Sequence, residues 1–84
     1  MARPALLFTR HAEDMLIERG IDRAWVETTI YEPESVDPDP AQPGVFRAYR
    51  RIAERGGRFL RVVYVPGDQN IRVLTAFFDR TRRN

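Results

Sequence analysis

Apolar and polar residues follow two different periods along the chain, which predicts helices in its first part and strands in its second part. In the first part, Thr9 offers an N-cap and Gly20 offers a left-handed stop for one helix. Asp22 offers the N-cap of a second helix, which should end before Pro33 because a residue that precedes a proline avoids the helical conformation. The pattern therefore predicts a tight helical pair over about residues 10–32.

The second part contains β-rich runs at about residues 45–52, 59–65 and 70–79, which are separated by short turns. Before these runs lies a proline-rich acidic loop, residues 33–44, which could hold a short edge strand. The whole chain, residues 1–84, is expected to form one α+β domain with two N-terminal helices on one face of a three- to four-stranded antiparallel β-meander. The antiparallel sheet would cover residues 45–79, and the basic tail, residues 80–84, is expected to fray.

The turn after Val65 decides which face of the sheet carries the arginines, because a one-residue slip exchanges the two faces. A four-residue loop pairs Val65 with Asn70, and it places Arg61 and Arg72 on one face as diagonal neighbours, roughly 7–8 Å apart. A five-residue loop would put one arginine on each face, and a β-bulge could also change the pairing. We prefer the four-residue loop because it leaves a continuous apolar face for the helices. The residues expected on that apolar face are Leu60, Val62, Tyr64, Ile71, Val73, Thr75 and Phe77.

The preceding strand adds basic residues to the arginine face. A five-residue turn, residues 53–57, places Tyr49 opposite Arg61 and Arg47 opposite Val63. The polar residues expected on this face are Arg47, Tyr49, Arg51, Arg61 and Arg72. Because no acid is expected among them, the face should carry an uncompensated positive charge. An ordinary exposed surface or a protein interface would show a similar pattern.

The distribution of charge favours the second half of the chain as a binding surface. Residues 1–44 contain four arginines and nine acidic residues, whereas residues 45–84 contain ten arginines and three acidic residues. This asymmetry indicates a surface for a polyanion such as RNA, with Arg47, Arg51 and Arg80 as phosphate-binding residues. The acidic loop is then either a solvated connector or a flap that occupies the basic surface until a substrate arrives.

Metal-independent cleavage of RNA needs a base, an acid and a cation near the phosphate. Arg61 and Arg72 are the candidate cations, while Tyr49 and His11 are the candidate proton carriers. Histidine exchanges protons readily near neutral pH, but the helix that carries His11 should cover the face opposite the arginines. The sequence has no cysteine and a single histidine, so we expect no metal and no cofactor.

The sequence also bears on location and assembly. No apolar run is long enough to cross a membrane, and the first residues lack the apolar core of a secretory signal. A soluble cytoplasmic protein is therefore expected. The last strand would lie at an exposed edge, where a second copy could pair with it to form a homodimer.

Two long stretches of the chain carry a resemblance to a known family. They are TRHAEDMLIERGID and FRAYRRIAERGGRFLRVVYVPGDQNIRVLTAF. Over about residues 8–79 the chain resembles the domain-of-unknown-function family 4258, which is similar to the BrnT and RelE toxins of bacterial toxin–antitoxin systems. The resemblance implies two helices against a three- or four-stranded antiparallel sheet, a ribonuclease activity and a cognate antitoxin as partner. His11, Arg19 and Thr75 match positions of the family pattern.

These observations lead to two hypotheses about function. In the first, the protein is a toxin-like domain that binds RNA and could cleave it as a metal-independent endoribonuclease. In the second, it is a non-catalytic module that binds a protein or a nucleic acid.

Overall fold

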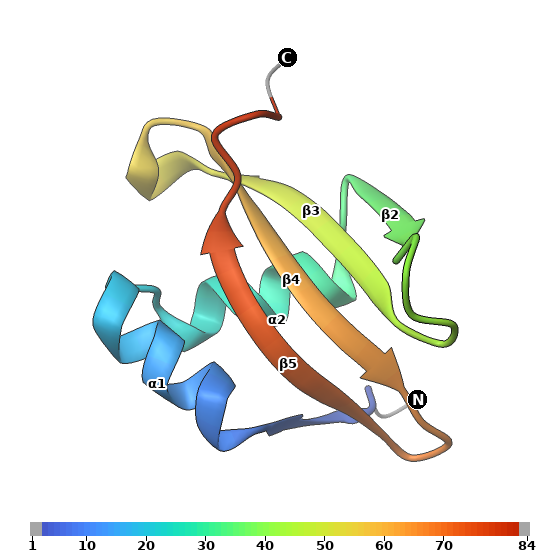
Figure 1. Ribbon diagram of the computed structural model, residues 1–84. Coiled ribbons are helices and arrows are strands. Elements are labelled where there is room, and N and C mark those ends of the chain that lie inside the picture. Colours follow the sequence, from blue (N-terminus) through green and yellow to red (C-terminus); the bar gives the residue numbers. More distant parts are fainter. Residues whose placement is uncertain (1–2, 83–84) are drawn as a thin grey trace.

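Five strands form one sheet in the computed structural model, which describes residues 3–82, and their order across the sheet is β1-β5-β4-β3-β2 (Figure 1). Along the chain the elements are β1 (Ala5–Phe8), α1 (Arg10–Arg19), α2 (Arg23–Tyr31), β2 (Ser35–Pro38), β3 (Phe46–Ile52), the short 3-10 helix η1 (Ala53–Arg55), β4 (Arg58–Pro66) and β5 (Asn70–Phe78). The protein is thus α+β, and both helices come before β2 to β5.

The two helices begin and end at the predicted residues. The Thr9 hydroxyl accepts a hydrogen bond from the Ala12 N–H at 3.0 Å, and the Asp22 carboxylate accepts one from the Ala24 N–H at 2.9 Å. Gly20 ends α1 in the left-handed conformation, with φ of 63°. Local side-chain chemistry is therefore sufficient to set these boundaries.

The sheet differs from the predicted antiparallel meander at both edges. β1 pairs with β5 in parallel, so that Leu6 lies beside Ile71, and β2 forms the opposite edge beside β3. The prediction of a purely antiparallel sheet of three or four strands is therefore wrong. Two parallel strands need a long connection between them. Here the connection is the part of the chain from α1 to the end of β4.

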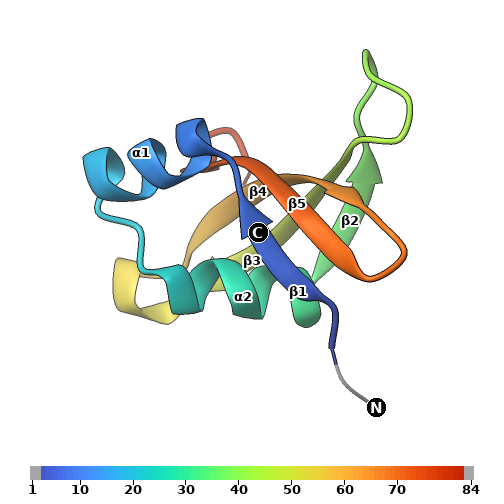
Figure 2. The same ribbon diagram turned by 90° about the horizontal axis from the view of Figure 1, so that it is seen from below.

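The helices cover one face of the sheet and leave the other face open. α2 packs against β3 and β4, while α1 packs against β5 beyond the end of β1 (Figure 2). Fully buried side chains between these layers include Val26 of α2 and Leu60, Val62 and Val73 of the sheet. In Figure 1 the open face of β3, β4 and β5 looks toward the reader, and α2 lies behind it.

The register between β3 and β4 is the predicted one. Tyr49 pairs with Arg61 and Arg47 pairs with Val63, as a five-residue turn between these strands requires. These four residues therefore share the open face.

The predicted register between β4 and β5 is wrong. Val65 pairs with Arg72 instead of Asn70, and Pro66 pairs with Ile71, so the turn begins one residue later than expected. Arg61 pairs with Phe77 and lies four residues along β4 from Val65. Arg61 and Arg72 are therefore separated by roughly 13 Å along the strands, and they are not diagonal neighbours.

A β-bulge in β5 causes a second error in the predicted faces. Tyr64 pairs with Val73 and Val63 pairs with Thr75, so that Leu74 is left without a partner. Beyond the bulge the two faces of β5 are exchanged. Ala76, rather than Phe77, is the fully buried residue that packs into the core.

The end of the described chain folds back onto the sheet. The N–H and the hydroxyl of Thr81 donate to the Asp79 carboxylate at 2.9 and 2.6 Å, and Arg82 Nη2 donates to the Ser35 hydroxyl at 2.7 Å. Thr81 and Arg82, which belong to the tail predicted to fray, thus form hydrogen bonds with Asp79 and Ser35, and residues 83–84 of this tail lie outside the described residues. No helix within residues 3–82 is long and apolar enough to cross a membrane.

Candidate anion-binding site

Acidic side chains neutralise the arginines of β3 on the open face. The Arg51 guanidinium lies 3.0 Å from the Glu34 carboxylate, and Arg47 Nη2 lies 3.4 Å from Asp39 Oδ2. Both acids come from the predicted proline-rich loop, whose residues in β2 pair with β3. The expectation of an arginine face without acids is therefore wrong, because it did not place the acids beside the possible edge strand next to the arginines of β3.

Arg61 is neutralised by a buried acid that follows β5. Its Nη2 atom donates to Asp79 Oδ2, and the Asp79 side chain is only 6% exposed. The pKa of Asp79 is lowered to about 2, mainly because the Thr81 hydroxyl donates to its carboxylate, with smaller contributions from the Thr81 N–H and from Arg61. Asp79 is therefore a charged anchor for Arg61 and for the last described turn of the chain.

Tyr49 is covered by the same turn. It is 2% exposed, and the Arg82 guanidinium carbon lies 3.7 Å from its ring centre. Arg61 lies 5.4 Å from the same ring centre. The hydroxyphenyl ring thus packs beneath two cations, where it has no room to stack a base or to meet a substrate hydroxyl.

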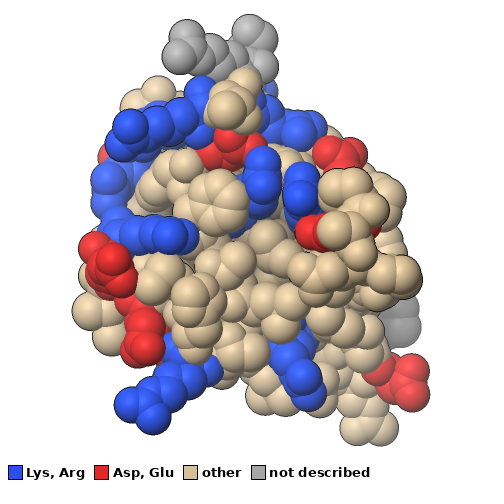
Figure 3. All heavy atoms as spheres, in the orientation of Figure 1, with Lys and Arg blue, Asp and Glu red and all other residues tan. Residues whose placement is uncertain are grey.

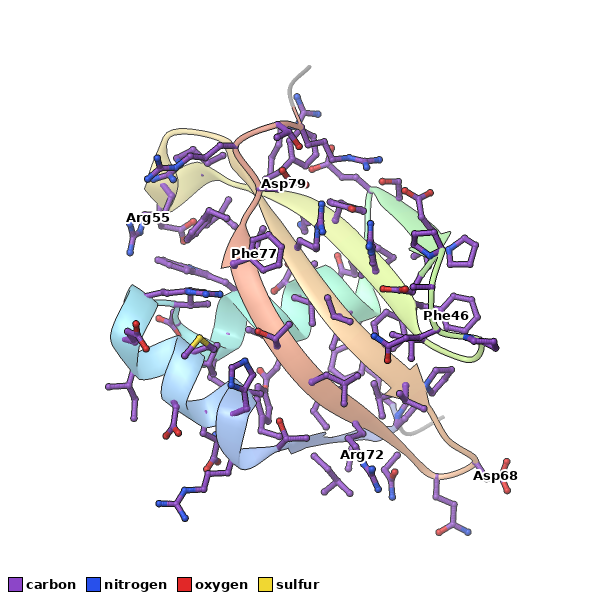
Figure 4. The ribbon with its side chains drawn as sticks, in the orientation of Figure 1. Phe46, Arg55, Asp68, Arg72, Phe77 and Asp79 are labelled. Atoms are coloured by element: carbon purple, nitrogen blue, oxygen red, sulfur yellow. The ribbon has the colours of Figure 1, made fainter. Side chains whose placement is uncertain are left out.

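The other two candidate catalytic residues lie elsewhere. Arg72 is exposed near the β4–β5 turn, at the same end of the sheet as Asp68, whereas Phe77 and Asp79 lie toward the opposite end (Figure 4). His11 is exposed in the first turn of α1. Of the four predicted catalytic residues, only Arg61 and Tyr49 are thus brought together.

A different group of arginines gathers where β5 ends. A hollow of about 540 Å³ and a second hollow of about 370 Å³ share Arg58 and Arg80 as lining residues. We call their cationic lining residues the arginine rim: Arg19, Arg55, Arg58, Arg80 and Arg82. Figure 3 shows that basic side chains are densest at the end of the open face where η1 and the end of β5 lie.

Aromatic rings and backbone carbonyls hold the rim arginines in place. The Arg55 guanidinium carbon lies 5.2 Å from the ring centre of Phe78 and 5.6 Å from that of Trp25, and Arg55 Nη2 donates to the Gly20 carbonyl at 2.8 Å. Arg19 Nη1 likewise donates to the Ala76 carbonyl at 3.0 Å. These contacts fix the direction of the Arg55 and Arg19 guanidinium groups before any ligand binds, which lowers the entropy cost of binding.

The rim carries positive charge that its own acids do not balance. Among the ion pairs within residues 3–82, none includes Arg19, Arg55, Arg58 or Arg80. The smaller hollow has no acidic lining residue, and the larger hollow has only Asp79, which already accepts three hydrogen bonds. A guanidinium with free N–H groups is well suited to bind phosphate oxygens.

The lining of the hollows is better suited to binding than to acid–base catalysis. Neither hollow is lined by a histidine, and their one carboxylate stays ionised because its pKa is about 2. Within residues 3–82, no group of three or more His, Cys, Asp or Glu side chains could hold a metal ion.

Of the predicted phosphate-binding residues, only Arg80 belongs to the rim. Arg19, Arg55 and Arg58 were not among the phosphate-binding candidates, because they lie in α1, in η1 and at the start of β4. The one local signal is the turn sequence ERGGR, residues 54–58, in which arginines flank two glycines. Such a turn brings its arginines together at the end of the sheet only when the two strands that it connects are paired.

The fold and this site define a small α+β protein with an arginine-rich sheet end. The family described as "Domain of unknown function (DUF4258)" matches residues 8–78, and the chain belongs to this family. A comparison with curated proteins gives no match. The similarity to BrnT and RelE toxins stays a prediction.

Proposed function

We propose that the protein binds single-stranded RNA through the arginine rim, by contacts to phosphate groups. The observation that carries this proposal is the smaller hollow, which four arginines and two phenylalanines line without an acid. RNA supplies a row of phosphates, and guanidinium forks bind phosphate in the bidentate geometry that they use for carboxylates.

Binding at the rim should depend little on base sequence. Arginines already occupy the ring faces that bases would need, since Arg58 lies 5.1 Å from the ring centre of Phe78 and Arg19 lies 5.6 Å from that of Phe77. The aromatic residues therefore orient the cations instead of reading bases. A flexible single strand can bend into both hollows, whereas a duplex presents only its rigid outer phosphates.

This proposal is the non-catalytic version of the RNA-binding hypothesis. Cleavage would require a proton carrier beside the bound phosphate, but His11 is exposed on α1 and Tyr49 is buried beneath Arg82. An antitoxin partner, a homodimer and a cytoplasmic location also stay predictions. The expectation that the last strand lies at an exposed edge is wrong, because β1 pairs with β5.

The test is binding of a fluorescent 12-nucleotide RNA, measured by anisotropy at several salt concentrations. The test variant is Arg58→Gln/Arg80→Gln, and the control is Arg10→Gln/Arg72→Gln, which removes the same charge from exposed positions outside the rim. Loss of two phosphate contacts should lower the slope of log Kobs against log salt by about 1.4. We expect the rim variant to lose roughly tenfold or more in affinity at 0.1 M salt, and the control to lose less than about threefold.

Equal losses in the two variants would contradict the proposal, because they would mean that net charge alone drives binding. The same RNA is run on a denaturing gel after incubation with EDTA. Intact RNA is expected. Cleavage that the rim variant loses would instead support a ribonuclease.

A further inference from the structure

Three carboxylates from one segment occupy guanidinium groups next to the rim. We call residues 34–39 the acidic segment, after Glu34, Asp37 and Asp39, which pair with Arg51, Arg82 and Arg47 respectively. A carboxylate and a phosphate present similar oxygen pairs to an arginine fork. The segment therefore stands where the phosphates of a bound strand could stand.

The three pairs are not equally tight. Glu34 holds Arg51 firmly, since its carboxylate accepts from the Arg51 N–H at 2.7 Å and from its Nε at 3.1 Å. Asp39 reaches Arg47 at 3.4 Å, and Asp37 reaches Arg82 at 3.5 Å. The Asp37 side chain is 53% exposed, and a pair of this kind contributes little to stability. The Asp39 side chain is only 9% exposed, but it contacts the Arg47 guanidinium at the single distance of 3.4 Å. The Asp37 and Asp39 end of the segment is thus held more weakly than the Glu34 end, and it is the end at which a competing anion can take over the arginines.

Two arginines on this face also have hydrogen-bonding capacity that the protein does not use. The Nε atoms of Arg47 and Arg61 are buried and have no hydrogen-bond partner within the described residues. A buried donor without an acceptor costs about 1–3 kcal/mol. A phosphate that replaced the Asp39 carboxylate could accept from both Nε and Nη2 of Arg47.

The position of Arg82 connects this face to the rim. Arg82 lines the larger hollow, lies over Tyr49 and approaches Asp37. Tyr49 and Arg47 are two residues apart on the same face of β3, and hence roughly 7 Å apart. A strand that leaves the rim at Arg82 therefore meets Arg47 next.

We propose that Arg47 and Arg82 form a second, masked phosphate-binding site, and that Asp37 and Asp39 act as internal competitors which keep a single-stranded RNA from filling this site in the wild type. This inference rests on the proposed function of the rim and extends it along β3. A hydrogen bond from the Ala41 N–H lowers the pKa of Asp39, which favours the charged carboxylate beside Arg47.

The variant that tests this site is Asp37→Asn/Asp39→Asn, which removes the competing charge and preserves the loop. Asp39 Oδ1 accepts from the N–H groups of Ala41 and Gln42 at 2.9 and 3.1 Å, and an asparagine oxygen can keep both bonds. Circular dichroism should therefore remain that of the wild type.

The control is Asp14→Asn/Asp68→Asn, which makes the same change of charge at two exposed positions outside the acidic segment. Binding of the 12-nucleotide RNA is measured as a function of salt. We expect Asp37→Asn/Asp39→Asn to bind about tenfold more tightly than the wild type, with the salt slope steeper by about 1.4 because two more phosphates are engaged. The control should gain less than about threefold, with an unchanged slope. Adding Arg47→Gln to the test variant should remove about half of the extra slope.

Three results would overturn the inference or separate it from the rim proposal. If the test variant and the control gain equally while rim variants still weaken binding, the masked site is wrong and the rim stands. If the rim variant binds like the wild type but Asp37→Asn/Asp39→Asn still gains slope through Arg47, the rim is wrong and the second site stands. If no variant binds RNA, both proposals are wrong.

Discussion

Replacing Asp79 by asparagine should destabilise the protein by about 2 kcal/mol at neutral pH. The carboxylate has a pKa of about 2 in the folded protein, against an ordinary value of 3.8. Each pKa unit corresponds to about 1.4 kcal/mol of preference for the charged form. The substituted side chain can still accept from Thr81 through its amide oxygen, but its amide nitrogen would point N–H donors at Arg61, whose buried charge would lose its partner.

The pH dependence gives the sign of this effect. Because folding lowers the pKa of Asp79, the charged carboxylate stabilises the folded state above the ordinary pKa of 3.8, and this contribution disappears as the pH falls through about 2. The difference in stability between the wild type and Asp79→Asn should therefore be constant from pH 7 to pH 5. It should shrink to about 1 kcal/mol at pH 3.

Urea denaturation at pH 7, 5 and 3 measures this difference, with Asp14→Asn as a control at an exposed position. At pH 7 the melting temperature of Asp79→Asn should also fall by roughly 8–16 °C, while the control should change stability by less than about 0.5 kcal/mol. Equal stability of wild type and Asp79→Asn at pH 7, or a difference that does not shrink at pH 3, would refute the role assigned to Asp79.

Three further substitutions, one of them with a matched control, have defined outcomes. His11→Ala should leave RNA binding and RNA integrity unchanged, and a loss of either in the anisotropy or gel assay would restore His11 as a site residue. Gly20→Ala should lower stability by about 1–2 kcal/mol because its φ is +63°, and it should also weaken RNA binding because the new Cβ would lie 3.1 Å from Arg55 Nη2. Gly44→Ala, with φ of +82° and open space around it, is the matched control and should lower stability without affecting binding. Leu60→Ala, at a fully buried position, should cost about 2–5 kcal/mol in urea denaturation.

Local sequence was enough to predict both helices and one hairpin. Thr9, Gly20 and Asp22 act on backbone groups within a few residues of themselves, so their effect does not depend on the rest of the fold. The β3–β4 register followed from the length of the turn between Ile52 and Arg58, which pair in the structure. Arg50, which interrupted the apolar side of β3, donates to the Glu32 carbonyl at the end of α2.

The short edge strand that the proline-rich loop could hold is present as β2, but the opposite edge, β1, could not be predicted because its partner lies far away in the sequence. Ala5–Phe8 is a short apolar segment whose strand partner is residues 70–73. The bulge at Leu74 has no turn residue to reveal it, yet it reverses the faces of everything that follows in β5. The faces of β5 were therefore predicted wrongly because of a bulge in its backbone, and the propensities of its residues do not reveal this bulge.

The arginine rim was not predicted for a related reason. Charge totals correctly indicated an acidic half and a basic half, but they could not indicate that β2 brings Glu34 and Asp39 onto the arginines of β3. The arginines left without acids come from separate elements that meet only at the end of the sheet. No periodic pattern in the sequence connects Arg19 with Arg80.

The most direct test of the rim is a titration of ¹⁵N-labelled protein with the 12-nucleotide RNA, followed by backbone amide chemical shifts. The account predicts that the largest changes occur at Gly56, Gly57, Arg58 and Arg80, which line the two hollows. Largest changes around Arg72 and the β4–β5 turn, with the rim amides unaffected, would contradict it.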